Sequence, residues 1–421
     1  MGDILRGRFA DISAGDHIVF IYDDTSELMA FAVPFIKDGL AKRERCLCVI
    51  GDLSPAEVTE ALAAGGVDVA RESQRGALEV LRGEEFAGPP PVDPLRLADA
   101  VRKRAQEAES NGFAGQRIAG EMTWVLTASL PGRALVEYEL LLEGAADSLT
   151  IACMYRKDRF DPAVLQQMIR THAKVVAGDY VYLSLSALFQ NLARADLQGL
   201  AKSARERRVP KAEFFFHQGD PAAEVFMLMN GMVKLVRTDP DGRSVILRIA
   251  NPIEPFGARA ALGATSRFAS AEALEDSRAL VWDSATILQA IMTHPAVSLN
   301  AIRLLEERVD EERGRLLDLA TVGVEQRLAR LLLRLERTVG RKSPAGVVLG
   351  VSLSGQDLAE LVITTPYTIS RILAEWRRLR IADVRREQIL LQDPERIAAI
   401  AALRTGRELP EVGKSGPAAR E

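Results

Sequence analysis

The chain has 421 residues, 48% of them apolar, which is too long for one hydrophobic core and predicts two to four domains. No apolar run approaches the length of a membrane span, and the first residues, MGDILRGRFADISAGDH, are too charged for a signal peptide, so we expect a cytoplasmic protein with no membrane partner. Its three cysteines, Cys46, Cys48 and Cys153, suit a reducing compartment better than a disulfide framework.

Charge is distributed unevenly along the chain. The net charge is −4, yet residues 323–405 hold 14 Lys and Arg against 9 Asp and Glu, so this segment carries +5 and the remainder −9. The mild total argues against a chain coated in nucleic acid, whereas a local basic region is what a DNA-binding domain needs.

Short β-rich apolar runs alternate with helical stretches from residue 16 to about 182. The predicted strands are HIVFIYDD, RCLCVIGD, ALEVLRG, QRIAGEMTWVL and SLTIACMYR. Residues 25–43 and 54–66 have helical period, and residues 88–94 (GPPPVDP) are expected to form a loop. This alternation predicts a parallel α/β sheet.

The pattern changes past residue 210 to short strands separated by turn signals. Residues 230–231 (NG) and 240–242 (PDG) are tight-turn signals between apolar runs. They predict a small antiparallel barrel or sandwich.

Some forty residues from Ala296 onward have a helical pattern. An apolar stripe lies among their charges: Leu304, Leu305, Val309, Leu316, Leu317 and Leu319. A stripe of this length predicts a dimer seam, the alternative being a helix that packs on its own domain. The last residues, 406–421, lack large apolar side chains and are expected to be disordered.

Two short helices are predicted near the C-terminus. Ser354 and Asp357 form a capping-box pattern for the first, and Thr365 and Pro366 suit the N-cap and first position of the second. One face of the second helix is apolar, with Ile369, Ile372, Leu373, Trp376 and Leu379; the opposite face carries Tyr367, Ser370, Arg371, Ala374 and Arg378. Such a polar face could enter a DNA major groove, an ordinary αα-hairpin being the alternative.

Residues 381–393 (IADVRREQILLQD) then predict a β-hairpin wing with Arg385 and Arg386 near its tip. Together with TTPYTISR in the second helix, this segment resembles the winged helix-turn-helix of the Crp/Fnr transcription factors, nearest to their nitrogen-oxide-responsive branch. The stripe helix resembles the family's dimerisation helix, and FFFHQGDPAAEVFMLMNGMVKLV resembles the opening strands of its cyclic-nucleotide-binding-like β-roll. The turn between the two helices has Ile363 where the family usually has glycine, so it could take a different shape.

This resemblance covers about half of the chain. It implies a homodimer that binds an operator in double-stranded DNA and acts with RNA polymerase. The DNA contacts it implies are Ser354, Gln356, Thr365, Pro366, Tyr367, Thr368, Ser370, Arg371, Arg378, Arg385 and Arg386.

The effector cassette of the cyclic-AMP-binding members is degenerate here. Gly257 is present, but Ala258 stands where the ribose-binding acid would be, and Arg267-Phe268 replaces the Arg-Ser phosphate pair. A buried anion needs several donors besides one charge, so cyclic-nucleotide binding is not expected. No cysteine in this half could hold an iron–sulfur cluster. Haem on His217 or His294 is a minor option, and a turn or surface histidine is the alternative.

Four N-terminal segments, GDHIVFIYDD, RCLCVIGD, AGEMTW and IACMYRKDRF, resemble the MEDS domain, the sensory domain of the dichloromethane-response regulator DcmR. That domain is distantly similar to the KaiC branch of the RecA-like ATPases. YDDTSELMAF lacks the glycines and the lysine of a phosphate-binding loop, so no ATPase activity is expected.

Reactive side chains near the strand ends are the candidate sensory residues, because open α/β sheets bind ligands there. They are His17, Tyr22, Cys46, Cys48, Glu121, Trp124, Cys153 and Tyr155. They could converge on a metal or a small electrophilic or one-carbon ligand, with His17 and Glu121 as the polar contacts. Alternatively, the cysteines fill the core.

The predicted fold class is multidomain α/β + β + α. It comprises a RecA/KaiC-like MEDS domain (1–182), a β-roll (183–296), a dimerisation helix (297–322), a winged helix-turn-helix (323–405) and a tail (406–421). We expect a transcription regulator, not an enzyme, that couples an unknown small-molecule or redox signal to operator binding. The alternatives are an N-terminal domain that acts chemically on a small molecule or one that docks a partner protein.

Overall fold

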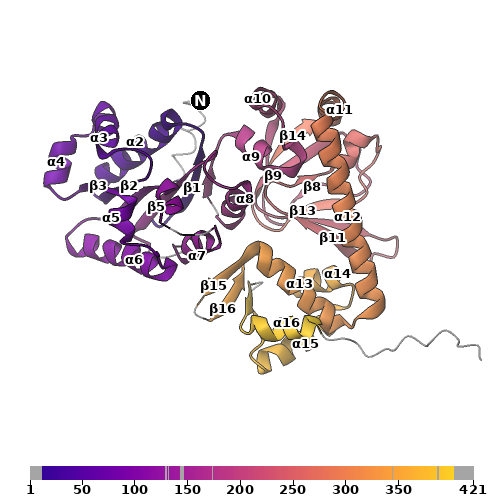
Figure 1. Ribbon diagram of the computed structural model, residues 1–421. Coiled ribbons are helices and arrows are strands. Elements are labelled where there is room, and N and C mark those ends of the chain that lie inside the picture. The colour runs from indigo at the N-terminus through magenta and orange to yellow at the C-terminus, as the bar shows by residue number, and fades with distance from the viewer. Residues whose placement is uncertain are drawn as a thin grey trace, which may run out of the picture.

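The computed structural model describes residues 12–128, 130, 132–142, 147–172, 174–343, 345–385 and 388–402. An N-terminal α/β domain lies beside a β-roll, and a smaller C-terminal domain lies beneath both (Figure 1). The predicted tail, residues 406–421, is outside the described residues. No helix in the described ranges combines the length and apolarity that a bilayer crossing requires.

A six-stranded parallel sheet, ordered β3-β2-β4-β5-β1-β6, forms the N-terminal domain. Its strands are β1 (His17–Tyr22), β2 (Arg45–Ile50), β3 (Leu78–Arg82), β4 (Gln116–Glu121), β5 (Leu149–Arg156) and β6 (Lys174–Val176). The run QRIAGEMTWVL is a strand only as far as Glu121, and the prediction of a longer strand was wrong. The Glu121 carboxylate accepts a hydrogen bond from the backbone N–H of Thr123, which starts a 3₁₀ helix over Met122–Leu126.

Helices cover both faces of this sheet. One face packs against α2 (Thr25–Ala41) and α3 (Pro55–Ala64), and the other against α6 (Pro94–Ser110), α7 (Gly132–Leu142) and α8 (Pro162–Thr171). Two short helices, α4 (Val69–Gln74) and α5 (Gly83–Ala87), flank β3. With both faces covered, the strands are apolar on both sides, which explains their near-continuous hydrophobic runs.

The β-roll consists of two four-stranded antiparallel sheets, ordered β11-β10-β13-β8 and β12-β9-β14-β7. The strands are β7 (Arg205–Val209), β8 (Phe214–Phe216), β9 (Glu224–Asn230), β10 (Val233–Thr238), β11 (Ser244–Ala250), β12 (Pro255–Phe256), β13 (Ser270–Ala273) and β14 (Ser277–Asp283). Both predicted turns are present. Gly231 and Gly242 adopt the left-handed φ values of +89° and +81° that these tight turns require.

Two helices follow where the sequence showed one long helical pattern. After α11 (Ser284–Thr293), α12 (Pro295–Thr321) runs along the β-roll, and α13 (Val324–Val339) starts the C-terminal domain (Figure 1). That domain contains α14 (Gly355–Val362), α15 (Pro366–Arg378), α16 (Pro394–Ala402) and the antiparallel sheet β15-β16-β18-β17. Its strands are β15 (Gly340–Ser343), β16 (Gly346–Leu349), β17 (Ala382–Arg385) and β18 (Gln388–Leu391).

The three parts share hydrophobic cores. One apolar cluster runs from Val19 of β1, through α9 (Asp179–Leu185) and α10 (Arg194–Ser203), to Met227 and Trp282 of the β-roll. A second joins Ile246 on the outside of the roll to the C-terminal domain. The expected domain boundary at residue 182 therefore falls inside a helix, α9, and within a continuous core.

Candidate functional site

The two C-terminal helices form a helix-turn-helix with the predicted caps. Ser354 and Asp357 make a capping box at α14, and Thr365 Oγ1 accepts from the Thr368 N–H at 3.2 Å at the start of α15. Ile363 sits in the turn at φ 55° and ψ 72°, a left-handed conformation. A β-branched residue therefore adopts the left-handed conformation that glycine favours.

Arg327 of α13 explains how the turn holds this conformation. Its guanidinium donates to the carbonyl oxygens of Val322 at 2.9 Å, Val362 at 3.0 Å and Ile363 at 3.3 Å. These bonds satisfy carbonyls at the end of α14 and tie the turn to the neighbouring helix.

The polar face of α15 points into solvent. Ile369, Leu373 and Trp376 are buried in the domain core, as predicted, whereas Tyr367 is 79% exposed and Ser370 and Arg371 are exposed beside it. Within the described part of the chain, Arg371 makes no ion pair or hydrogen bond. Arg378 instead forms two hydrogen bonds to Glu375, at 2.6 and 2.9 Å. The two arginines therefore differ: Arg371 can reach out, while Arg378 is already engaged.

The other expected DNA contacts lie around this face. Pro366 and Thr365 are exposed at the N-terminus of α15, and Gln356 of α14 donates to Glu360 at 2.7 Å. The predicted wing exists as the hairpin β17–β18. Arg385 is its last described residue before the tip, and only its backbone is described; Arg386 lies outside the described residues.

The degenerate cassette lines a cavity of about 170 Å³ in the β-roll. Arg267 is buried there, and its guanidinium donates to the carbonyl oxygens of Gly257 at 3.1 Å and Glu224 at 2.8 Å, stacked 4.1 Å over the Phe216 ring. Phe268 is 45% exposed, with the Arg237 guanidinium 3.9 Å above its ring. The guanidinium that would have to bind a phosphate is thus already hydrogen-bonded to backbone carbonyls.

His217 and His294, the two histidines considered for haem, lie at the surface and at a helix end. His217 is exposed in the turn after β8, and His294 caps α12. In the described residues they belong to different elements and form no shared cluster.

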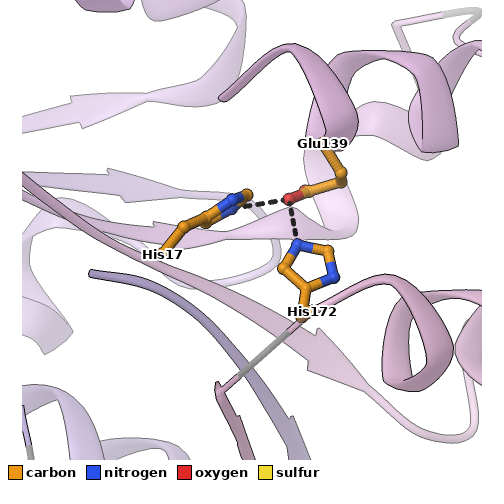
Figure 2. A group of neighbouring side chains, drawn as sticks. All are labelled: His17, Glu139 and His172. Atoms are coloured by element: carbon orange, nitrogen blue, oxygen red, sulfur yellow. Dashed lines mark ion pairs between the residues drawn. The ribbon is translucent and has the colours of Figure 1, made fainter. Parts of the chain in front are cut away.

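In the N-terminal domain, the eight candidate residues separate into three groups. The first surrounds Glu139, a residue that sequence reasoning missed (Figure 2). Glu139 Oε2 lies 2.9 Å from His17 Nε2 and 3.4 Å from His172 Nε2. Cys153 Sγ lies 3.5 Å from His17 Nε2, and the Tyr155 hydroxyl donates to Glu139 Oε1. His172 and Glu139 are buried, as are the three predicted members.

Burial alone would raise the pKa of Glu139, but hydrogen bonds and positive charge from His17 and His172 outweigh it and hold the pKa well below its usual value. Burial and the nearby Glu139 charge raise the pKa of the Cys153 thiol to about 12. The group therefore combines a carboxylate with a neutral thiol at neutral pH.

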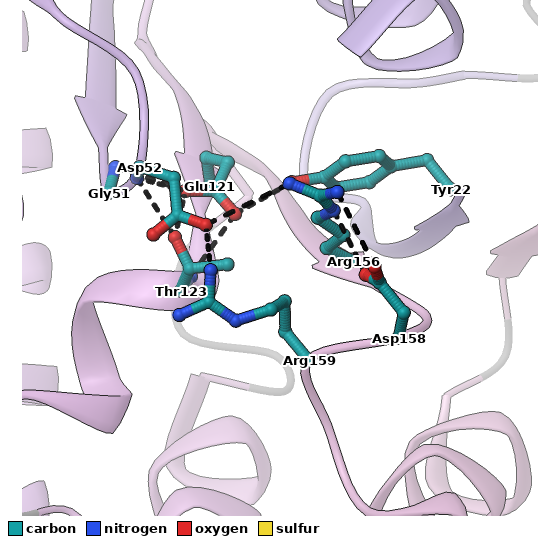
Figure 3. A network of polar contacts seen from close by, with 8 residues as sticks. All are labelled: Tyr22, Gly51, Asp52, Glu121, Thr123, Arg156, Asp158 and Arg159. Carbon is teal, nitrogen blue, oxygen red and sulfur yellow. Dashed lines mark hydrogen bonds and ion pairs between the residues drawn. The ribbon is translucent and has the colours of Figure 1, made fainter. Parts of the chain in front are cut away.

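The second group surrounds Glu121 at the carboxyl end of β4 (Figure 3). Its carboxylate accepts from the hydroxyls of Tyr22 at 2.7 Å and Thr123 at 2.6 Å. It also accepts from the backbone N–H groups of Gly51, Asp52 and Thr123 at 3.0–3.3 Å. Five donors occupy this buried carboxylate, so it holds the strand ends together instead of facing a ligand.

This position explains Tyr22 and Trp124. Burial and the Glu121 charge raise the pKa of Tyr22, so its phenol remains a donor. Trp124 packs edge-on against Phe86 and over Gly83, where a Cβ would come within 2.1 Å of the indole. His17 lies at the opposite end of β1 from Tyr22, about 16 Å along a six-residue strand, so His17 and Glu121 do not share one site.

Cys46 and Cys48 form the third group. Both lie in the core on the α2 side of the sheet, away from Cys153, which lies on the α7 side. Burial raises the pKa of both thiols, that of Cys48 to about 12. They have the character of core residues.

Three family models match the chain in order. The MEDS model (MEthanogen/methylotroph, DcmR Sensory domain) matches residues 16–173, the cyclic nucleotide-binding domain residues 206–294, and the Crp-like helix-turn-helix domain residues 326–400.

Curated relatives match the second half. The CRP-like cAMP-activated global transcriptional regulator of Mycobacterium tuberculosis is 26% identical over 216 residues, which are 51% of this chain and 96% of that protein. The Cyclic AMP receptor protein of Thermus thermophilus is 32% identical over 189 residues, 45% of this chain and 84% of that protein. The chain belongs to the Crp/Fnr family.

A solved structure, FixK2 from Bradyrhizobium japonicum, is 21% identical with a TM-score of 0.43, covering 48% of this chain and 99% of that one. The 421-residue chain itself is a DNA-binding transcription regulator of the Crp/Fnr family with an added N-terminal MEDS domain. Assignment to the nitrogen-oxide-responsive branch stays a prediction.

Glu139 and His172 are the site residues of this Crp/Fnr protein that the sequence prediction missed. The signal for Glu139 was its place in α7, where it shares the buried face with Leu135, Tyr138 and Leu142. A carboxylate on an otherwise apolar helix face needs a buried partner. His172 follows α8 directly and gave no comparable signal.

Proposed function

We propose that this chain is a homodimeric regulator whose MEDS domain receives a signal and whose winged helix-turn-helix reads an operator. The exposed face of α15 carries the proposal, because it offers Tyr367, Ser370 and Arg371 near the helix N-terminus, which enters a groove in this class of domain. Arg371 has no side-chain partner among the described residues. Cytoplasmic DNA and RNA polymerase are the expected partners.

The dimer is proposed from α12. Apolar side chains on its outer face are about half exposed or more: Leu299, Ile302, Leu305, Val309, Leu316 and Leu317. Ile302, Val309 and Leu316 recur at seven-residue intervals, with Leu305 at the intervening position, which is the spacing of a coiled-coil seam. Leu304, expected in the stripe, packs against its own core instead. A second copy would cover this face.

The N-terminal domain is proposed to sense rather than catalyse. Asp24 caps α2 by accepting from the Glu27 N–H at 3.0 Å, and Glu27 accepts from the Asp23 N–H at 2.9 Å. Three carboxyl groups thus gather at the helix terminus where a phosphate-binding loop would hold a nucleotide. These three carboxyl groups disfavour phosphate binding, which supports a regulatory role.

Coupling between the domains is supported by their contacts. Arg170 of α8 pairs with Glu254 of the β-roll at 3.6 Å, and α7 and α8 contact β15 and α13 of the DNA-binding domain. A rearrangement of α7 or α8 would therefore be transmitted to the winged helix-turn-helix through packed elements.

Fluorescence anisotropy tests the proposal, using operator fragments selected from genomic DNA and a scrambled duplex at two salt concentrations. An arginine paired with guanine contributes roughly 1–3 kcal/mol of discrimination, so Arg371→Ala should weaken operator binding about tenfold or more and scarcely change binding to scrambled DNA. Arg378→Ala is the matched control on the same helix and should change both affinities alike. Equal losses on both duplexes for Arg371→Ala would refute base reading by this residue.

A separate prediction concerns the arginines of the wing. Arg385 and Arg386 are expected to contact phosphates, so their replacement should lower both affinities together and flatten the salt dependence.

A further inference from the structure

Three metal-ligand side chains from three different elements converge inside the N-terminal domain (Figure 2). His17 begins β1, Glu139 lies on α7 and His172 follows α8. Their ligand atoms all lie within 4.8 Å of one another, and all three residues are buried. We propose that His17, Glu139 and His172 bind one divalent transition-metal ion, with Zn²⁺ as the reference ion.

The spacing of the ligand atoms fits this role. Zinc binds histidine nitrogen and carboxylate oxygen at about 2.0–2.2 Å, so two ligand atoms of a tetrahedral site lie about 3.3 Å apart. The carboxylate oxygen Oε2 of Glu139 lies 2.9 Å from one imidazole nitrogen and 3.4 Å from the other. The two rings meet at 76° with centroids 4.5 Å apart, so they approach from different directions.

Neighbouring groups orient two of the three ligands. The Tyr155 hydroxyl donates to Oε1 of Glu139, which leaves Oε2 facing the two imidazoles. His172 Nδ1 lies 2.8 Å from the carbonyl oxygen of Met168, and because a carbonyl only accepts, Nδ1 carries the proton. A backbone or tyrosine partner behind each ligand is the usual arrangement in metal centres.

The ring geometry suits a cation between the groups. With Nδ1 directed at the Met168 carbonyl, Nε2 of His172 faces Oε2 of Glu139 at 3.4 Å. A metal ion bonded to both atoms would take the place of a second proton on the ring.

The donor set selects the class of metal. Two imidazoles and one carboxylate suit zinc, iron or cobalt, whereas magnesium and calcium prefer oxygen ligands alone. Cys153 lies beside His17, but it is outside the group of three whose atoms all fall within reach of one another. We therefore assign three protein ligands.

The site lies next to the junction of the three domains. His172 borders a cavity of about 390 Å³ that is also lined by Asn230 and Asp276 of the β-roll and by Val339 and Gly350 of the DNA-binding domain. Its imidazole is fully buried, so an ion bound there would be enclosed by protein. The proposed metal site goes beyond the proposed sensory function and stands whether or not the domain receives a signal.

Calorimetry with ZnCl₂ on untagged, chelator-treated full-length protein tests the site. We expect one zinc ion per chain, and an affinity reduced about 100-fold or more by Glu139→Gln or His172→Asn, because each removes a direct ligand. Glu137→Gln, two residues away on α7, and His217→Ala, in the β-roll, are matched controls and should bind zinc like the parent. No zinc binding, or parental affinity in both ligand variants, would overturn the assignment.

X-ray absorption at the zinc edge of the unmodified protein gives an answer that needs no variant. Scattering from two imidazoles with oxygen ligands is expected, and a spectrum without imidazole scattering would also overturn the proposal. Zinc binding is measured without DNA, so its outcome is separate from the operator-binding test of Arg371.

Discussion

Lys234 of the β-roll and Asp357 of α14 form a salt bridge of 2.7 Å that joins the roll to the DNA-binding domain. Glu272 of β13 lies 3.2 Å from the same ammonium group. Asp357 also closes the capping box with Ser354, so one carboxylate both starts the first helix of the motif and anchors it to the roll.

Loss of this bridge should loosen α14. Hydrogen bonds between charged groups contribute about 1.5–3 kcal/mol, so Lys234→Met should lower the opening free energy of the α14 amides by about 2 kcal/mol, measured by hydrogen exchange. Lys202→Met, an exposed lysine of α10, is the control. Unchanged exchange in Lys234→Met would show that the bridge contributes nothing in solution.

The effect of Lys234→Met should depend on pH. Burial would raise the pKa of Asp357, but the hydrogen bonds from Lys234 and Ser354 outweigh it and lower the pKa below its usual 3.8. Burial likewise opposes the charge of Lys234, yet its two acidic partners raise its pKa above 10.5. The salt bridge therefore stabilises fully between the usual pKa values of the two groups, 3.8 for Asp357 and 10.5 for Lys234. It should disappear as pH falls through the pKa of Asp357, so the parent and Lys234→Met should then converge.

The α12 face predicts the assembly state. Leu305→Glu combined with Val309→Glu places four charges across a two-fold seam, and the protein should sediment as a monomer. Glu307→Lys lies on the opposite face of the same helix and should leave the dimer intact. A double variant that remains dimeric would place the dimer contact elsewhere.

Ile363 predicts a stabilising substitution. A non-glycine residue in the left-handed region is strained by about 1–3 kcal/mol. Glycine removes this strain from the folded state, but it also stabilises the unfolded chain through greater conformational entropy, which offsets part of the gain. Ile363→Gly should therefore raise the stability of the DNA-binding domain by about 1 kcal/mol in urea denaturation. Arg380, at φ 55° but without β-branching, should gain less as Arg380→Gly. A destabilised Ile363→Gly would contradict the strain argument.

The β-roll should not respond to cyclic nucleotides. Ala258 offers no carboxylate to a ribose, and the Arg267 guanidinium is held by the carbonyls of Gly257 and Glu224. Calorimetry with cyclic AMP and cyclic GMP should show no binding at micromolar concentration. A clear micromolar isotherm would contradict this expectation.

Local patterns carried much of the fold. The apolar runs identified five of the six parallel strands, and the caps at Ser354 and Thr365 identified both helices of the DNA-reading motif, because strand burial and helix capping depend on neighbouring residues. The sixth strand, Lys174–Val176, is too short to produce a pattern. The predicted division between residues 322 and 323 coincides with the break at Gly323 between α12 and α13, although the helical periodicity continues on both sides.

The sensory residues depended on three-dimensional contacts instead. His17 and Glu121 both follow the rule that polar residues mark strand ends, but the rule does not say which end, and they lie at opposite ends. Glu139 and His172 join His17 only because α7 and α8 pack on the same face of the sheet. The spacing of these residues in the sequence does not indicate that they are in contact.

The apolar cluster shared by the sheet and the β-roll limits how this protein can be divided. A cut at residue 182 passes through α9 and exposes Leu183, Leu185 and Phe189, which are buried against both neighbours. The sensor therefore cannot be exchanged between regulators as an independent cassette. A chimera that grafts it onto another DNA-binding domain should therefore carry the roll with it.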